Sequence, residues 1–339
     1  MAMKCIGILA TVMLGLALTV DGLGRDLSGL FEEVKGQVVT IYTNKSNADS
    51  LGSEGEQGTG VIISAEGKVI TAAHVVHSAD VVIVEYVDGR RVRAEVLTTA
   101  PWADVAALQL TERPPPEYVA TLGVSQEMKI GEELFVVGTP LGLGHSLSFG
   151  HLSGRRKNSE DFMVKAELLQ TDASINPGNS GGPMYNMEGE VVGVVSHILS
   201  NSGGFEGVGF AVSIDVAKEL LLERSAFWSG MEYKVLYGEA PKVLNIDRDF
   251  AFIVESVARG SFGERLGLKG GRIPVSINGT EFMGGGDVLL SVQGVPIDSV
   301  EQALKLRGIV RDVNPDEVLK VVVMRKGKLI ELEAPRSLK

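Results

Sequence analysis

The chain has 339 residues, 44% of them hydrophobic and 22% charged, which is the composition of a globular protein with sizeable cores. At about 150 residues per domain, this length predicts two domains. The formal net charge is −11, with acids and bases interspersed, which argues against nucleic acid as the main partner because nucleic-acid binding favours a basic face. The single cysteine, Cys5, excludes an intrachain disulfide.

Residues 1–22 have the features of an export signal. Lys4 precedes an apolar run from Cys5 to Val20, and small residues follow near Gly22. This pattern predicts a secretory signal peptide, and the run is short for a membrane span, which takes about 20 residues. An uncleaved N-terminal anchor is the alternative. In either case we expect an exported protein.

Short strands and turns dominate the next part of the chain. A helix is predicted over Arg25–Gly36, where apolar residues recur at helical spacing, and a polar loop over Asn44–Gln57. Because short apolar strands then follow one another without an intervening helix, we predict a β-barrel over about residues 37–112. The proline-rich connector Arg113–Pro116 leads to a second barrel over about residues 122–212.

The first predicted barrel contains a candidate base and an acid that could orient it. His74 lies at the end of the apolar strand predicted over Val69–Val76, and Asp104 is the one acid beside the apolar run Val105–Leu110. A serine nucleophile needs a base, and an imidazole base needs a carboxylate that fixes its tautomer. His77, three residues beyond His74, is predicted to be solvated.

The candidate nucleophile is Ser180, in the small-residue turn of Gln170–Pro183. Glycines open backbone angles that other residues avoid, so consecutive N–H groups can point the same way. The N–H groups of Gly178 and Ser180 are therefore the predicted oxyanion-hole donors. An ordinary glycine-rich turn is the alternative. The chain order His74, Asp104, Ser180 is that of the chymotrypsin-type double barrel.

Metal and cofactor signals are weak. The glycine-rich, basic segment Pro140–Asp161 contains His145 and His151, but no third ligand accompanies them. A metal site is therefore not expected, and no nucleotide or other cofactor is implied.

Three segments jointly resemble the HtrA/Deg family of trypsin-fold serine proteases. In order, they are Gly58–Ile63 leading to Thr71–Val76, Ala103–Ala106, and Gln170–Pro183. The resemblance implies a trypsin-like protease domain over residues 25–230 with His74, Asp104 and Ser180 as its catalytic triad. It also implies an ATP-independent serine endopeptidase of the cell envelope, in the periplasm, that degrades unfolded or misfolded proteins without a cofactor.

The resemblance also indicates how substrate binds. The expected substrate-binding residues are Ile175, Ser196, His197, Ile198 and Leu199. An extended peptide is expected to pair with the backbone of residues 196–198. Ile175, Ile198 and Leu199 would line the primary pocket, where no acid is present, so cleavage after small or medium aliphatic residues is expected. The alternative is that these three belong to the core. His197 stands where the family usually has a small residue.

Two further properties follow from the resemblance. The segment Pro140–Asp161 occupies the position of a sensor loop that relays ligand occupancy to the oxyanion hole, and Arg155 or Arg156 matches its relay arginine. The N-terminal segment of the family builds a trimer contact. A homotrimer is therefore expected, with Phe31 at that contact.

The last third of the chain resembles a PDZ domain. Ser213 is predicted to cap a helix over Ile214–Phe227 that closes the protease domain, and residues 233–335 follow as the PDZ domain. The segments that carry the resemblance are Phe250–Val257, Leu266–Gly270, Gly286–Gly294, Val300–Arg307 and Val318–Arg325. Arg272–Gly285 is an insertion relative to most PDZ domains, and Leu244–Asp249 lacks the usual glycine-bearing carboxylate cradle. Peptide binding and a purely structural or regulatory role therefore both stay open.

The sequence thus predicts a mainly β protein, a trypsin-like double β-barrel followed by a PDZ domain. Its expected partners are unfolded or misfolded polypeptides, a C-terminal peptide at the PDZ domain, and further copies of itself. Two other functions remain: a holdase chaperone with secondary proteolysis, and a membrane-anchored signalling protease that cuts one regulator.

Overall fold

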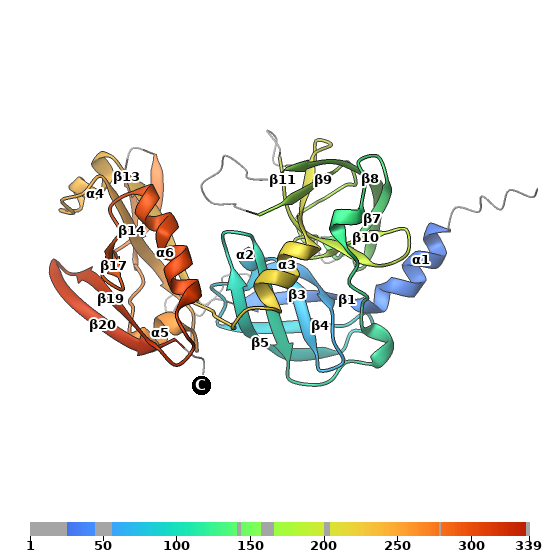
Figure 1. Ribbon diagram of the computed structural model, residues 1–339, viewed down its shortest axis with the longest axis horizontal. Coiled ribbons are helices and arrows are strands. Elements are labelled where there is room, and N and C mark those ends of the chain that lie inside the picture. The colour runs from blue at the N-terminus through green and yellow to red at the C-terminus, as the bar shows by residue number, and fades with distance from the viewer. Residues whose placement is uncertain are drawn as a thin grey trace, which may run out of the picture.

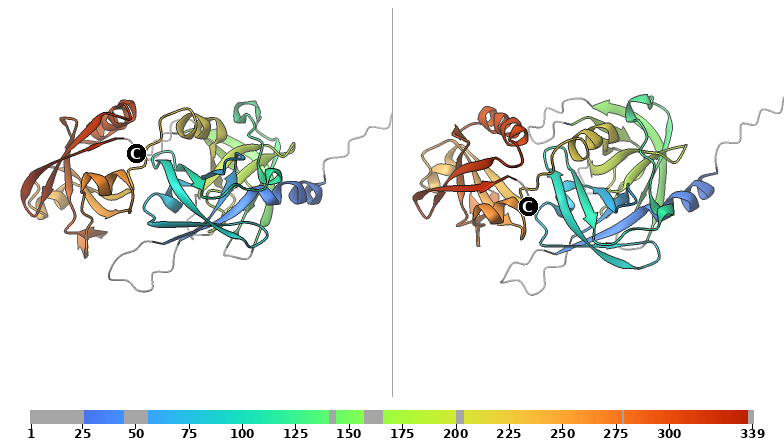
Figure 2. Two further views of the ribbon diagram at one scale, coloured as in Figure 1. Left: turned by 90° about the horizontal axis from the view of Figure 1, so that it is seen from below. Right: turned by 60° about the horizontal axis from the view of Figure 1, so that its bottom comes forward.

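The computed structural model describes residues 26–44, 56–140, 144–156, 166–199, 204–277 and 279–336. The predicted leader over 1–22 and most of the loop predicted over Asn44–Gln57 lie outside these residues, as does part of Pro140–Asp161. Two β-barrels occupy the middle of the molecule, between the helix α1 (Leu27–Val34) at one end and a C-terminal sheet domain at the other (Figure 1, Figure 2). No helix within the described residues is long and apolar enough to cross a membrane.

The first barrel is a closed, six-stranded antiparallel barrel, which confirms the fold predicted for this region. Its strands are β1 (Val38–Asn44), β2 (Gln57–Ile62), β3 (Lys68–Thr71), β4 (Val81–Glu85), β5 (Arg91–Ala100) and β6 (Val105–Leu110), in the spatial order β1-β2-β3-β6-β5-β4. The strand predicted through Val76 is too long, because β3 ends at Thr71 and a one-turn helix, α2 (Ala73–Val76), follows it. Ala72 and Ala73 are fully buried, and their small side chains let this helix begin against the barrel wall.

The second barrel is also closed and six-stranded. Its strands are β7 (Glu133–Gly138), β8 (Ser146–Arg156), β9 (Leu168–Thr171), β10 (Pro183–Asn186), β11 (Val191–Ile198) and β12 (Gly209–Ser213), in the order β10-β11-β12-β9-β8-β7. Two 3₁₀ turns, η2 (Pro116–Tyr118) and η3 (Ser125–Glu127), lie in the connection between the barrels.

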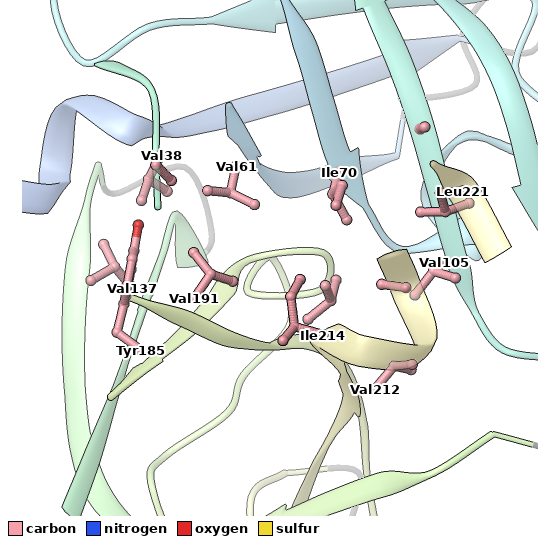
Figure 3. Close-up of a cluster of buried hydrophobic side chains, with 14 of the residues drawn as sticks. Val38, Val61, Ile70, Val105, Val137, Tyr185, Val191, Val212, Ile214 and Leu221 are labelled. Carbon is pink, nitrogen blue, oxygen red and sulfur yellow. The ribbon is translucent and has the colours of Figure 1, made fainter. Parts of the chain in front are cut away.

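One apolar cluster joins the two barrels. Val38, Val61 and Ile70 of the first barrel face Val137 and Tyr185 of the second (Figure 3). These side chains are fully buried. Burial of apolar surface contributes about 25 cal/mol per Å², so the shared cluster holds the barrels together and fixes the crevice between them.

Two helices cover the ends of this shared cluster. α1 begins at its N-cap Asp26, whose side chain accepts from Ser28 N, and buries Leu30 and Val34 in the cluster. A 3₁₀ turn, η1 (Lys35–Gln37), connects α1 to β1. Phe31 is only partly buried against the same cluster.

The second of these helices is α3 (Ile214–Leu221), whose N-cap is the predicted Ser213. The prediction that it extends to Phe227 is wrong. The amide of Phe227 donates to Thr98 Oγ1 at 3.2 Å, and its carbonyl accepts from Thr99 N at 3.1 Å. These bonds hold Phe227 beside β5, where it cannot continue the helix.

The C-terminal domain is built on one antiparallel sheet. Its elements are β13 (Met231–Tyr237), α4 (Glu239–Val243), β14 (Phe250–Val257), α5 (Phe262–Leu266), β15 (Ile273–Ile277), β16 (Thr280–Gly284), β17 (Val288–Val292), β18 (Val295–Pro296), α6 (Val300–Asp312), β19 (Val318–Arg325) and β20 (Lys328–Pro335). The sheet order is β13-β14-β17-β19-β20, with β18 paired to β17. The insertion Arg272–Gly285 forms the separate hairpin β15–β16.

The sheet order shows where a further strand could extend the C-terminal sheet. The loop Leu244–Asp249, which lacks the usual glycine-bearing carboxylate cradle, leads into β14. β14 is an interior strand, paired with β13 on one side and with β17 on the other. Among the described strands, β20 forms one edge of this sheet, and β13 forms the other, where it pairs with β14 alone. Any peptide that extends this sheet at that end must therefore pair with β13.

His77 connects the two domains, so the prediction that it is solvated is wrong. Its Nδ1 lies 2.7 Å from Thr99 Oγ1, and its Nε2 lies 3.0 Å from the carbonyl of Met231, the first residue of β13. Its own carbonyl accepts from Trp228 Nε1 at 2.7 Å. The end of the helix that carries His74 is thus bonded directly to the start of the C-terminal domain.

A buried ion pair anchors the C-terminal domain, and its loss should be costly. Arg325 Nε and Nη2 each donate to the fully buried carboxylate of Asp287 at 2.7 Å, and Lys269 N donates to the same group. We expect Asp287→Ala to lower the free energy of unfolding of this domain by about 3–5 kcal/mol, because it leaves a partly buried guanidinium without its anion. Urea unfolding followed by fluorescence measures this change.

The matched control is Glu333→Ala, which removes the acid of an exposed pair with Lys320 at 3.8 Å. Because exposed pairs contribute about 0–1 kcal/mol, its unfolding midpoint should stay near that of the native chain. A loss below about 1 kcal/mol for Asp287→Ala contradicts the anchoring role.

Candidate active site

Three distant segments converge where the barrels meet. His74 lies on α2, directly after β3 of the first barrel, and Asp104 occupies the turn before β6. Ser180 lies in the turn between β9 and β10 of the second barrel. Thr59 of β2 joins the two barrels here: its amide donates to Ser180 O at 2.8 Å and its hydroxyl to Gly178 O at 2.6 Å.

Glycine is required where the Ser180 turn touches the first barrel. Gly181 has a φ of +84°, and a Cβ at this position would lie 2.1 Å from Thr71 Oγ1 and 2.2 Å from Thr59 O. Any larger residue would push the turn away from the strand that leads to His74. The glycine after Ser180 therefore brings the second barrel against the first.

His74 and Asp104 form a close pair. His74 Nδ1 lies 2.9 Å from Oδ1 and 3.0 Å from Oδ2 of Asp104, and the backbone amide of His74 donates to Oδ1 at 3.0 Å. Because an ionised carboxylate only accepts, Nδ1 carries the proton and Nε2 is left as the basic nitrogen. Asp104 has a φ of +54°, an uncommon backbone conformation in which its carboxylate is held toward His74.

The surroundings of this pair shift both pKa values. Partial withdrawal from water, the largest influence, lowers the pKa of His74, but the hydrogen bond and charge of Asp104, with a contribution from Glu56, outweigh it and raise the pKa above its usual value. Burial, the largest influence on Asp104, raises its pKa, yet hydrogen bonds and charge from His74 and a bond from Ser196 bring it below its usual value. Asp104 is therefore ionised at neutral pH and stabilises the protonated form of His74.

Ser180 is placed next to this pair but is turned toward β11. Its hydroxyl donates to the carbonyl of Ser196 at 3.4 Å, and among the described residues it makes no hydrogen bond with His74. Catalytic hydrogen bonds are often long or absent in ligand-free sites and form when substrate binds. Rotation about the Cα–Cβ bond of Ser180 breaks the hydrogen bond to the Ser196 carbonyl and frees the hydroxyl to bond to another group.

The turn also offers two backbone donors. The amides of Gly178 and Ser180 donate to no group in the described part of the chain, whereas those of Asn179, Gly181 and Gly182 are all used within the fold. Gly178 has a φ of +99°, a conformation that favours glycine. The two unused amides are the ones that the sequence proposed for the oxyanion hole.

The predicted substrate-binding residues divide into three environments. Ile175 is buried in the core of the second barrel, and Ile198 packs partly buried against the same cluster. Leu199 is 65% exposed. Ser196 is buried and donates to Asp104 Oδ2 at 2.5 Å, whereas His197 is exposed and packs against Phe210 with 5.2 Å between the ring centroids.

Sequence reasoning missed two residues that organise the site. Ser196 was proposed as a backbone partner of substrate, but its hydroxyl also shares the Asp104 carboxylate with His74. In the sequence, this role was indicated only by a single hydroxyl residue in the mostly apolar strand β11. Thr59, which bonds to both ends of the Ser180 turn, had no signal beyond its place between Gly58 and Gly60.

The two arginines proposed for the sensor loop have different contacts. Arg155 is held by Glu167 Oε1 at 3.1 Å and by the carbonyls of Ser125 and Met128. Arg156 lies over the ring of Phe210, with 6.0 Å from its Cζ to the ring centroid. Arg155 thus ties β8 to the start of β9 and to η3, whereas Arg156 contacts a side chain of β12.

The other histidines are held apart. His145 Nε2 lies 2.9 Å from Val38 O, whereas His151 lies beside Asp172 at 3.6 Å. Within the described residues, no three side chains of the types that bind metals come together.

Comparison with known proteins agrees with this geometry. The model of the trypsin-like peptidase domain matches residues 58–194. A probable periplasmic serine endoprotease (DegP-like) of Hahella chejuensis is 37% identical over 232 residues, which cover 66% of this chain and 48% of the relative. A protein of the same name from Chlamydia muridarum is 30% identical over 282 residues, 81% of this chain and 53% of the relative. The chain thus spans about half the length of these relatives.

Two solved structures match nearly the whole chain. The HtrA-type protease AlgW with a decapeptide is 26% identical with a TM-score of 0.52, covering 93% of this chain and 99% of that one. AlgW with a tripeptide is 26% identical with a TM-score of 0.54, covering 92% and 97%. With the double barrel and the convergence of His74, Asp104 and the Ser180 turn, these matches show that the chain belongs to the HtrA/Deg family of trypsin-fold serine proteases.

Proposed function

We propose that the protein is an ATP-independent serine endopeptidase of the cell envelope that degrades unfolded or misfolded polypeptides. The observation that carries this proposal is the meeting of the His74–Asp104 pair with the Ser180 turn, whose Gly178 and Ser180 amides have no other use in the described fold. A nucleophile, an oriented base and aimed N–H donors are the parts that acyl transfer requires.

The geometry supports a two-step reaction. Ser180 Oγ attacks the substrate carbonyl while its proton passes to Nε2 of His74, the nitrogen that Asp104 leaves basic. The carbonyl oxygen becomes negative and accepts from the amides of Gly178 and Ser180. His74 then gives its proton to the leaving amine as the C–N bond breaks. In the second step, water attacks the acyl-enzyme with the same base, and Ser180 regains its proton.

An open strand edge lies beside Ser180 for the substrate. β10 pairs with β11 only as far as Val194, and Val195 is bonded to Gly181 and Gly182. Beyond this point, His197 and Ile198 pair with β12 on one side, and no described strand pairs with residues 196–198 on the other. An extended peptide can add to this edge through main-chain hydrogen bonds, which brings its carbonyl to Ser180 without demanding a particular sequence.

Aliphatic selectivity follows from the apolar side chains beneath this edge. Ile175, Ile198 and Phe205 belong to one apolar cluster, and a Cβ on Gly209 would lie 2.5 Å from Ile175 Cδ1. We infer that these residues form the floor and wall of the primary pocket, and that small or medium aliphatic residues such as Val, Ala or Leu fit there.

The C-terminal domain offers a second peptide site. A cavity of about 650 Å³ lies between the edge strand β13, α6 and the first barrel, and Tyr233, Phe252 and Leu306 are among its apolar lining residues. We propose that the C-terminal end of a polypeptide pairs with β13 there, as expected of a PDZ domain. The His77–Met231 bond offers a contact through which this site and the loop at Arg155 and Arg156 could regulate catalysis together.

Assembly and location complete the proposal. We propose a homotrimer whose contact includes α1 and Phe31, because α1 lies at the end of the molecule away from the C-terminal domain (Figure 1). The export signal predicted over residues 1–22 and the names of the relatives, which are periplasmic proteases, support a periplasmic location, soluble or anchored by an uncleaved leader.

Digestion of an unfolded protein tests the proposal. The full chain is incubated without ATP with casein and, separately, with native lysozyme, and the fragment ends are read by mass spectrometry. We expect casein to be cleaved after Val, Ala or Leu, and lysozyme only once it is reduced and unfolded. Intact casein, or cleavage mainly after Lys or Arg, contradicts the proposal.

A further inference from the structure

The carboxylate of Asp104 is connected to a second imidazole besides that of His74. Ser196 Oγ lies 2.5 Å from Asp104 Oδ2, and Nδ1 of His197 lies 3.0 Å from the same Ser196 Oγ. Neighbouring residues of a regular strand point to opposite faces. Here the pairing of β11 with β12 shifts between Val195 and His197, and such a bulge re-aims side chains. Both side chains can therefore lean toward Asp104.

The protons of this chain of contacts can be assigned. An ionised carboxylate only accepts, so the single hydroxyl proton of Ser196 is donated to Asp104. Ser196 Oγ must then accept from His197, which places a proton on Nδ1 of that imidazole. This bond survives when Nε2 of His197 is also protonated, because both nitrogens of an imidazolium are donors. His197 can therefore change its charge without losing its link to the active site.

The ring of His197 is held in place from the other side. It packs against Phe210 of β12 with 5.2 Å between the ring centroids and a tilt of 33°, and the guanidinium of Arg156 lies 6.0 Å from the centre of the same Phe210 ring. Within the described part of the chain, the charged or titratable groups connected to His197 in this way are Asp104 through Ser196, His74 beyond that carboxylate, and Arg156 across Phe210. One anion, Asp104, thus lies between two imidazoles, and imidazole is the side chain whose unperturbed pKa lies closest to neutral pH.

We propose that His197 is a positioning residue that acts on the His74–Asp104 pair through Ser196 and keeps His74 in its basic form at more acidic pH. When His197 is protonated, the hydrogen bond from its Nδ1 to Ser196 strengthens the hydrogen bond from Ser196 to Asp104. The positive charge of His197 also repels a second positive charge on His74. Both effects oppose protonation of His74, the base that the proposed reaction needs neutral. This inference rests on the proposed function but concerns the acid side of its pH dependence.

Removing the charge of His197 should raise the pKa of His74. Replacing His197 by a neutral residue removes the opposing charge, so His74 is protonated more readily and activity is lost at higher pH. For charges separated by roughly 8 Å in a medium between protein surface and water, the shift is about half a pH unit. Relative to its own value at pH 8, activity should therefore fall about threefold further on the acid side, because half a unit corresponds to a factor of about three.

The test uses the full chain with His197→Gln, whose amide can still donate to Ser196 but carries no charge. The acid limb of kcat/KM for an aliphatic peptide substrate is measured from pH 5 to 9. The matched control is His151→Gln, which removes a similarly exposed imidazole of the same barrel that lies beside Asp172 instead. We expect the acid limb to move to higher pH by about half a unit in His197→Gln and to stay in place in His151→Gln.

A second measurement does not depend on proteolysis. In the Ser180→Ala background, NMR titration of the labelled imidazoles reports the pKa of His74 directly, and it should rise by about half a unit with His197→Gln. His197→Asn, a shorter amide, replaces the glutamine variant if that variant is not folded by circular dichroism.

An unchanged or lowered pKa of His74 overturns the inference, as does an equal loss of kcat/KM at every pH, which indicates an ordinary substrate contact. If casein is not cleaved at all but the His74 pKa rises as expected, the inference stands and the proposed function fails. The two results are therefore distinguishable.

Discussion

Replacing Ser180 by alanine is expected to lower kcat/KM for a peptide or casein substrate by about 10⁴-fold or more. The reason is that no other described hydroxyl combines proximity to the His74–Asp104 pair with the two unused amides of the turn. The hydroxyl of Ser196 is the nearest competitor, but it is committed to Asp104 at 2.5 Å. Initial rates at saturating and subsaturating substrate measure the loss.

The same variant provides a direct chemical readout. A fluorophosphonate probe should label the native chain at Ser180, identified by peptide mass, and should leave Ser180→Ala unlabelled. Ser153→Ala, at an exposed position of β8, is the matched control and should keep full activity and labelling. Retention of more than about a hundredth of the activity by Ser180→Ala, with the fold intact, contradicts the role of Ser180 as nucleophile.

Replacing Asp104 by asparagine is expected to lower kcat by about 10⁴-fold. The amide of asparagine can donate to Nδ1 of His74, which moves the imidazole proton to Nε2, where the base is needed. The three groups that now donate to the carboxylate, namely the His74 amide, the His74 ring and the Ser196 hydroxyl, lose an anionic acceptor. The loss should therefore appear in kcat rather than KM.

The residual activity of Asp104→Asn should also change its pH dependence. Asp104 raises the pKa of His74, and activity requires neutral His74, so the native chain loses activity as the pH falls through a raised value. Without the carboxylate the pKa of His74 falls, and the acid limb moves to lower pH. Asp88→Asn, in an exposed surface pair with Arg90, is the control and should move neither kcat nor the limb. A limb that moves upward in Asp104→Asn argues against this account of the pair.

The double barrel and the family could be predicted because their signals are local in the sequence. Alternating apolar strands and turns need only neighbouring residues to be recognised, as does the glycine-rich turn around Ser180. The predictions that failed concern contacts between distant residues. His77 was expected in solvent because nothing near it in the chain indicates that Trp228 and Met231 lie against it.

The order of amino acids specifies which residue types are available for acyl transfer and how they follow one another along the chain. How these residues share their protons depends on the folded arrangement of both barrels. Ser196 reaches Asp104 across 92 residues of chain, and the bulge that also turns His197 toward Ser196 depends on the pairing of β11 with β12. Strand register is set by the packing of the whole barrel, so no local pattern of residues could have specified these hydrogen bonds.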